Sequence, residues 1–104
     1  MHTQPAGLTV CWGQKYRNIG KYPMTAEMAL TVGRSLVSYF EGGPSMARFV
    51  IGQDTRLSGD MLAHALAAGV CSQGGNACMI GVVPTPAVAR AAIVRKADAG
   101  VMIS

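Results

Sequence analysis

The chain has 104 residues, half of them hydrophobic and 13% charged, which supports one small folded domain and excludes a disordered chain. Its net charge of +4 comes from scattered basic residues, so a nucleic-acid-binding surface is not expected. The sequence contains no secretory signal and no apolar run long enough to cross a bilayer, so we expect a cytoplasmic protein without membrane contacts.

The first part of the chain carries little periodic signal. Leu8–Trp12 can form a short strand, whereas Gly13–Asn18 shows no clear period. We therefore treat residues 1–19 as an atypical N-terminal segment and place the domain at residues 20–104. Thr25 is suited to cap a helix that we predict over Thr25–Glu41, and Gly42-Gly43-Pro44 ends it.

The central stretch predicts a strand, a polar loop and a second helix. Phe49, Val50 and Ile51 are consecutive apolar residues, typical of a strand buried on both faces, which we place at Arg48–Gly52. A helix follows over Ser58–Gln73, with Ser58 as its N-cap and Asp60 near the positive end of its dipole.

The C-terminal third repeats this strand–helix order. We predict strands at Ala77–Val83 and Gly100–Ser104, with a helix over Thr85–Arg95 between them. Thr85 is the expected N-cap of that helix, with Pro86 at its first position. The alternation predicts an α/β fold, a three-layer α/β/α sandwich on a mainly parallel sheet.

Parallel strands place their carboxyl ends along one sheet edge, where α/β proteins bind ligands. Residues 53–58, the Pro84-Thr85 turn and whatever follows Ser104 should therefore lie together. Asp54, Arg56, Ser58 and Thr85 are the candidate phosphate-edge residues, because two helix N-termini point at this edge. The simpler interpretation is that Ser58 and Thr85 only cap helices, while the charged residues pair within the loop.

The cysteines and the acidic residues form no recognisable catalytic or metal motif. Cys11, Cys71 and Cys78 lack zinc-site spacing and are expected to be buried, reduced thiols. No glycine-rich nucleotide loop and no nucleophile elbow is present. The residues alone therefore predict no complete active site and no metal site.

Five sequence segments, in this order, resemble segments of the first domain of the α-D-phosphohexomutases. They are GKYPMTAEMAL, VIGQDTRLSGDML, AHALAAGVCSQG, GVVPTPAVA and KADAGVMIS. The resemblance covers residues 20–104 and is closest to members that interconvert glucosamine 6-phosphate and glucosamine 1-phosphate, for UDP-N-acetylglucosamine synthesis. It implies transfer from a phosphoserine through a bisphosphate intermediate, with Mg²⁺ neutralising charge.

The resemblance also implies what the chain lacks. The family's phosphoserine lies in an Ala-Ser-His-Asn-Pro loop directly after the Ile-Ser that ends this sequence, so Ser104 is not the nucleophile and no catalytic residue is present. The family opens with Phe-Gly-Thr-Asp-Gly-Ile-Arg-Gly, where this chain has Trp12-Gly13-Gln14-Lys15-Tyr16-Arg17, and Arg17 is the candidate for the family's arginine.

We therefore expect an inactive N-terminal fragment that needs no cofactor by itself. Its substrate in the full-length enzyme would be a phosphosugar, with Mg²⁺ held by other domains. The alternatives are a fragment of a phosphomannomutase or phosphoglucomutase, and a non-catalytic remnant that binds a partner. Self-association or docking to the missing domains is also expected, because the altered first strand should leave a sheet edge poorly covered.

Overall fold

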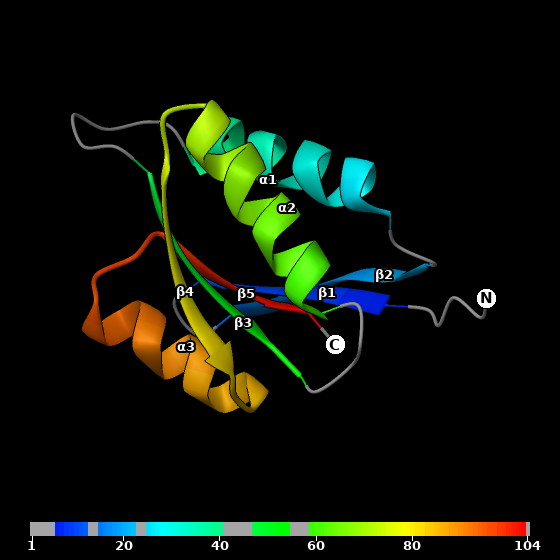
Figure 1. Ribbon diagram of the computed structural model, residues 1–104. Helices are drawn as coiled ribbons and strands as arrows, with labels where there is room; N and C mark the ends of the chain where they lie inside the picture. Colours follow the sequence, from blue (N-terminus) through cyan, green and yellow to red (C-terminus); the bar gives the residue numbers. More distant parts are fainter. Residues whose placement is uncertain (1–5, 13–14, 23–24, 41–46, 55–58, 104) are drawn as a thin grey trace.

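The computed structural model describes residues 6–12, 15–22, 25–40, 47–54 and 59–103. Figure 1 shows a three-layer α/β/α arrangement, in which α1 and α2 cover one face of a sheet and α3 covers the other. The helices and strands, in chain order, are β1 Ala6–Trp12, β2 Lys15–Tyr22, α1 Ala26–Phe40, β3 Arg48–Gln53, α2 Gly59–Ser72, β4 Asn76–Val82, α3 Thr85–Val94 and β5 Ala99–Ile103.

The described residues form one five-stranded sheet with the order β2-β1-β5-β3-β4. Strands β3, β4 and β5 are parallel, whereas β1 runs antiparallel to both β5 and β2. The predicted fold class is therefore confirmed: the sheet is mixed, with a parallel half built from the strand–helix units. Its three parallel strands end along one edge, which we call the carboxyl edge, and begin along the opposite amino edge.

The six predicted helices and strands after residue 20 all form, with ends that agree or differ by one residue. The apolar stretch at the N-terminus forms β1, as expected. Strand β2 was not predicted, and it spans position 20, where we placed the start of the domain. Its sequence, KYRNIGKY, has three basic residues and no run of apolar ones, so its strand character comes from pairing with β1.

Two of the predicted helix caps lie among the described residues. The Met28 backbone amide donates a 3.1 Å hydrogen bond to Thr25 Oγ1, which confirms the cap of α1. The cap predicted for α3 is wrong by one residue: Pro84, with φ −72° and ψ 155°, is the N-cap, and no side chain caps the helix. The proline ring fixes φ near this value, so Pro84 takes the extended N-cap backbone and Thr85 is already helical. Ser58 lies outside the described residues.

The core lies on both faces of the central strands. Phe49 and Ile51 pack toward α1 and α2, while Val50 packs toward α3, so the strand is buried on both faces as predicted. Among the cysteines, only Cys11 is fully buried. Cys71 is exposed at the end of α2, which corrects the expectation of buried thiols, because it lies outside the apolar stripe of that helix.

Candidate functional site

The carboxyl edge brings together residues from three strands. The Asp54 amide donates to the Ile103 carbonyl oxygen, and the Val83 amide donates to the Gln53 carbonyl oxygen, each at 3.0 Å. The structure thus places Asp54 beside the end of β5 and beside the turn into α3, as the parallel topology predicted. Arg56, Ser58 and Ser104 are the candidate residues outside the described part of the chain.

Gln53 organises this edge, and sequence reasoning did not single it out. Its side chain is 7% exposed, the one buried polar side chain among the described residues, and its amide nitrogen donates to Asp60 Oδ1. This hydrogen bond joins the last residue of β3 to the first turn of α2. It therefore ties together the two ends of the intervening polar loop. The sequence signal that could have indicated this bond is a glutamine at the end of an apolar strand, seven residues before an aspartate.

The two acidic residues of the edge do not make a metal site by themselves. Asp54 is half-buried and Asp60 is exposed, and one Asp60 oxygen already accepts from Gln53. Within the described ranges, no three His, Cys, Asp or Glu side chains are grouped as metal ligands. Because Mg²⁺ requires a near-octahedral set of oxygen ligands, the described residues of this edge do not fit the ion as a ligand set.

Helix α3 also begins at this edge. Thr85 is half-buried, and the first turn of α3 has neither an acidic residue nor a side-chain cap. The Ala87 amide is already used by a 2.9 Å hydrogen bond to the Pro84 carbonyl oxygen, and Pro86 has no amide hydrogen. The anion-binding capacity expected of this helix end is therefore reduced to the Thr85 amide.

The strand pairing places the backbone of Arg17 away from the carboxyl edge. Arg17 pairs with Val10 of β1, which pairs with Val101 of β5, which in turn pairs with Ile51. Arg17 is thus level with the middle of β3, on the far side of β1 and β5. The structure does not bring this backbone position together with Asp54 and Thr85.

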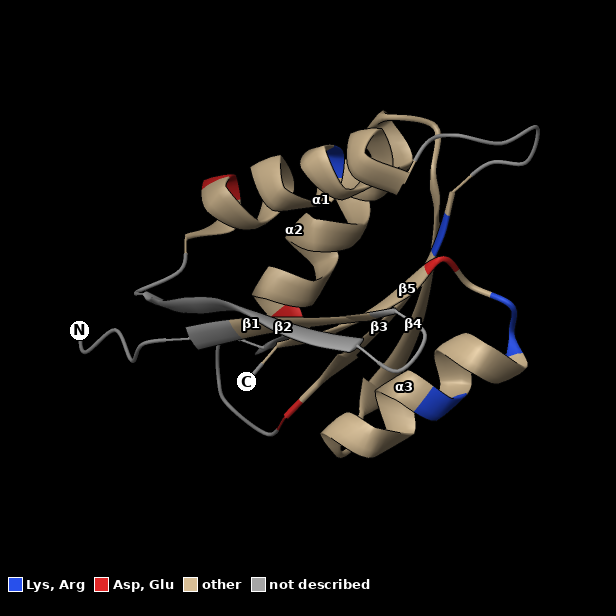
Figure 2. Cartoon of the chain, turned by 180° about the vertical axis from the view of Figure 1, so that it is seen from behind, with Lys and Arg blue, Asp and Glu red and all other residues tan. Residues whose placement is uncertain are grey.

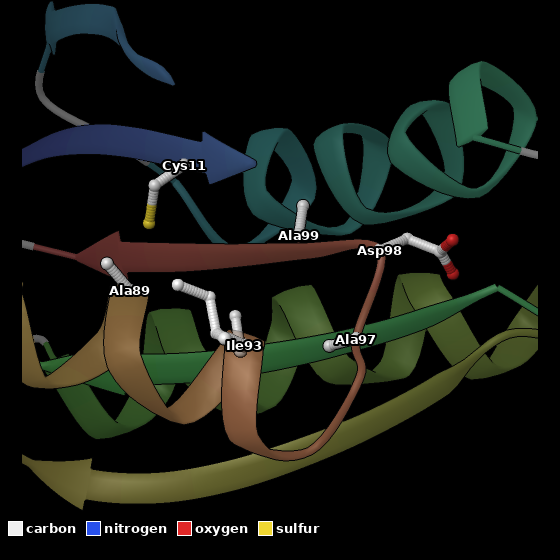
Figure 3. Close-up of a pocket in the computed structure, with 7 residues that line it drawn as sticks. Cys11, Ala89, Ile93, Ala97, Asp98 and Ala99 are labelled. Carbon is white, nitrogen blue, oxygen red and sulfur yellow. The ribbon is translucent and has the colours of Figure 1, made fainter. Parts of the chain in front are cut away.

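A separate pocket under α3 is too small to hold a substrate. It has a volume of about 30 Å³, room for little more than a water molecule. Figure 3 shows the sulfur of Cys11 pointing toward α3, whose Ala89 and Ile93 line the same pocket, while the carboxylate of Asp98 points away. Burial raises the pKa of the Cys11 thiol, which also donates a 3.4 Å hydrogen bond to the Gly100 carbonyl oxygen. This thiol is therefore a packed core group rather than a nucleophile.

Of the described helices, none is both long and apolar enough to span a membrane. The profile of the family described as "Phosphoglucomutase/phosphomannomutase, alpha/beta/alpha domain I" matches residues 14–104. The chain belongs to this family. Its α/β/α layers and mixed sheet agree with the domain that the description names.

Within the phosphohexomutases, the chain is similar to curated phosphoglucosamine mutases. The chain is 50% identical over 84 residues to a phosphoglucosamine mutase of Syntrophus aciditrophicus, covering 81% of this chain and 19% of the relative. It is 52% identical over 83 residues to the phosphoglucosamine mutase of Citrifermentans bemidjiense, covering 80% of this chain and 18% of that one. For the Sorangium cellulosum enzyme the identity is 53% over 83 residues, covering 79% and 17%. The chain thus spans less than a fifth of the length of these relatives.

Proposed function

We propose that the chain is the first-domain part of a phosphoglucosamine mutase, an enzyme that interconverts glucosamine 6-phosphate and glucosamine 1-phosphate. The observation that carries the proposal is the identity of 50% or more to phosphoglucosamine mutases across four-fifths of the chain. Such an enzyme is an isomerase that moves a phosphoryl group within its substrate. The chain's share of that work is to supply one wall of the phosphosugar site.

The carboxyl edge is the wall in question. Gln53 joins β3 to α2 and fixes where the intervening loop, with Asp54 at its start, leaves and re-enters the fold. Arg56 and Ser58 lie in that loop and are the proposed phosphate contacts, with the Thr85 amide beside them. Positioning groups of this kind assist phosphoryl transfer by holding the phosphosugar in line with the nucleophile.

The 104 residues do not carry the chemistry by themselves. Their serines include none in the Ser-His-Asn-Pro context of the family nucleophile, and the Mg²⁺ that the family uses is proposed to bind elsewhere in the enzyme. We therefore expect no turnover from the isolated chain, which needs no cofactor for folding. Such an enzyme would work in the cytoplasm, where its phosphosugars are made.

Two other functions are the alternatives. The family description itself names phosphoglucomutase and phosphomannomutase. The resemblance implies that the parts that select the sugar lie in other domains of the enzyme. A non-catalytic remnant that docks on an intact mutase is the other. The identity to phosphoglucosamine mutases favours the first proposal over both.

A domain exchange tests the proposal. Residues 20–104 would replace the matching segment of the Syntrophus aciditrophicus enzyme, and the 1-phosphate would be followed by ³¹P NMR with Mg²⁺ and a sugar bisphosphate. We expect the chimera to turn over glucosamine 6-phosphate, because residues 20–104 would then complete the phosphosugar site of the host enzyme. A chimera that folds, as judged by a cooperative melt, but stays inactive contradicts the proposal.

The isolated chain provides the second arm of the test. Under the same conditions it should give no product, while the unmodified relative serves as the positive control. Steady formation of glucosamine 1-phosphate by the purified chain would show that its own residues complete an active site. That result would overturn the assignment of the nucleophile to a segment after Ser104.

A further inference from the structure

Strand β4 is an outer strand of the sheet: it pairs with β3 on one side, and no described strand pairs with its other side. Its seven residues, NACMIGV, include no charge and no proline, the features that usually protect an edge from pairing. Met79 and Val82 are 39% and 56% exposed on it. A bulge opposite Ile51 and Gly52, with Gly81 at φ 79°, limits the regular part of the strand to residues 76–79.

The existing hydrogen bonds show which backbone groups of β4 face outward. The Asn76 amide donates to the Ala47 carbonyl oxygen, which directs Asn76 toward β3. Because backbone groups alternate along a strand, Cys78 also faces β3, and Ala77 and Met79 face away from it. These two residues offer two donors and two acceptors at the edge.

The face of β4 on the α3 side is open. Helix α3 packs mainly on β5 and β3, and a pocket of about 300 Å³ lies beside the first half of β4, lined in part by Cys78 and Arg95. Ile93 and Val94 of α3 are 64% and 69% exposed. Apolar surface and space are therefore available beside the unpaired strand.

The described charges are separated along the strand direction. The amino edge carries Arg48, Arg95 and Lys96 against one acidic residue, Asp98. The carboxyl edge carries Asp54 and Asp60 among the described side chains, and the sequence between them contains one basic residue, Arg56, so acidic residues outnumber basic ones at this end. The coloured segments in Figure 2 follow this separation. A second copy placed antiparallel sets each basic end beside an acidic end, whereas a parallel copy sets like charges together.

We propose that β4 is a self-association edge, on which the β4 strand of a second copy pairs antiparallel about a two-fold axis at Cys78. In this register Ala77 of each copy pairs with Met79 of the other, so all the outward donors and acceptors are used. The Cys78 residues then form a non-hydrogen-bonded pair, with Cα atoms about 4.5 Å apart. The dimer is weak, because only two residues of each strand pair.

Disulfide trapping tests the register. Cα atoms about 4.5 Å apart are within the range of a disulfide. In the test, diamide takes two electrons and two protons from two thiols to form one bond. We expect a Cys78–Cys78 dimer in Cys71→Ser to form about tenfold faster than a Cys71–Cys71 dimer in Cys78→Ser. Cys71 is the matched control because it is the more exposed thiol and random collision would favour it. Equal or reversed rates overturn the proposed register.

Sedimentation equilibrium tests the edge itself, on reduced protein. Met79→Lys places a charge on the strand and should weaken the dimer about tenfold or more, a change worth about 1.4 kcal/mol. Met28→Lys, on α1, is the control, because Met28 has almost the same exposure (41%) and lies far from β4 in the chain. Added salt should also weaken the dimer. A chain that stays monomeric at all accessible concentrations, or a dimer indifferent to Met79→Lys, overturns the proposal.

Discussion

At the scale of single residues, Gln53 shows how one buried polar group organises the carboxyl edge. Its side chain donates to Asp60 and its carbonyl oxygen accepts from Val83, so one residue connects β3 to the starts of α2 and α3. A buried polar group of this kind is costly when its partner is lost. The sequence shows the glutamine but not its partner, because the pairing depends on where the helix begins.

We expect Gln53→Leu to lower the free energy of unfolding by about 1–3 kcal/mol, since the hydrogen bond to a charged carboxylate is lost. Urea denaturation measures the change. Gln73→Leu is the control, because Gln73 is exposed after α2 and its replacement should change stability by less than about 0.5 kcal/mol. Equal effects of the two substitutions would show that the Gln53–Asp60 bond contributes nothing specific.

The buried thiol of Cys11 should make the stability of the fold depend on pH. Burial raises the pKa of its thiol above the ordinary value of 9.0 in the folded state. Above that pH the unfolded chain loses this proton while the folded chain keeps it, so the unfolded state binds fewer protons and stability falls as pH rises. The stability that comes from keeping the buried Cys11 thiol protonated is fully present below pH 9.0. It is lost as the pH rises from 9.0 to the pKa of the thiol in the folded state.

The matching measurement is the urea midpoint of the chain and of Cys11→Ala on both sides of that pH. Cys11→Ala should be less stable at neutral pH, because a buried side chain is shortened, but its stability should fall less steeply above pH 9.0. Parallel pH profiles for the two proteins would contradict the assignment of this loss to Cys11.

At the scale of the elements, α1 and α2 pack with their backbones in close contact. A Cβ atom added at Gly33 would overlap the Leu66 carbonyl oxygen, and one added at Gly69 would overlap the Leu30 carbonyl oxygen. The glycines are therefore required by the approach of the helices rather than by their own backbone angles. This explains why a residue unfavourable in helices lies in the middle of both.

Gly69→Ala should consequently destabilise the protein by about 1–3 kcal/mol, because the helices must separate, although alanine is the better helix former. Thermal or urea unfolding checks this. Ser35→Ala is the control, since Ser35 is exposed on α1 and a gain in helix propensity, smaller than that from glycine to alanine, comes there without a clash. A Gly69→Ala variant as stable as the parent would mean that the helices are not held at this distance.

Most of the elements were predictable because their sequences carry strong local signals. Buried strands such as Phe49–Ile51 are continuous apolar runs, and Gly42-Gly43-Pro44 ends a helix in any context. Strand β2 was not predictable, because KYRNIGKY has no alternation and forms through its hydrogen bonds with β1. The Thr85 cap was misplaced by one residue because proline backbone geometry decided between two adjacent candidates.

The position of the candidate site in the fold was predictable from the sequence, whereas the contacts between its side chains were not. Parallel topology alone put Asp54 and Thr85 at one edge. The side-chain bond from Gln53 to Asp60 and the position of Arg17 opposite Val10 depend on register and on packing, which local patterns do not encode. The family resemblance implied a reaction class but could not place these contacts.

At the scale of the whole molecule, the unpaired β4 edge couples stability to concentration. A small domain with an uncovered sheet edge is expected to be marginally stable, and only the folded chain can form the proposed dimer. By mass action the midpoint of thermal unfolding should then rise with protein concentration. We expect a reduced chain to melt below about 65 °C when dilute, within the range of ordinary mesophilic domains.

Calorimetry over a wide range of concentrations measures this dependence, with Met79→Lys as the comparison. The melting temperature of the parent should rise with concentration, whereas that of Met79→Lys should begin to rise only at about tenfold higher concentration, because its dimer is weaker. Met28→Lys should behave as the parent does. A sharp, reversible and concentration-independent melt of a monomer above about 65 °C would contradict both the marginal stability and the role of β4.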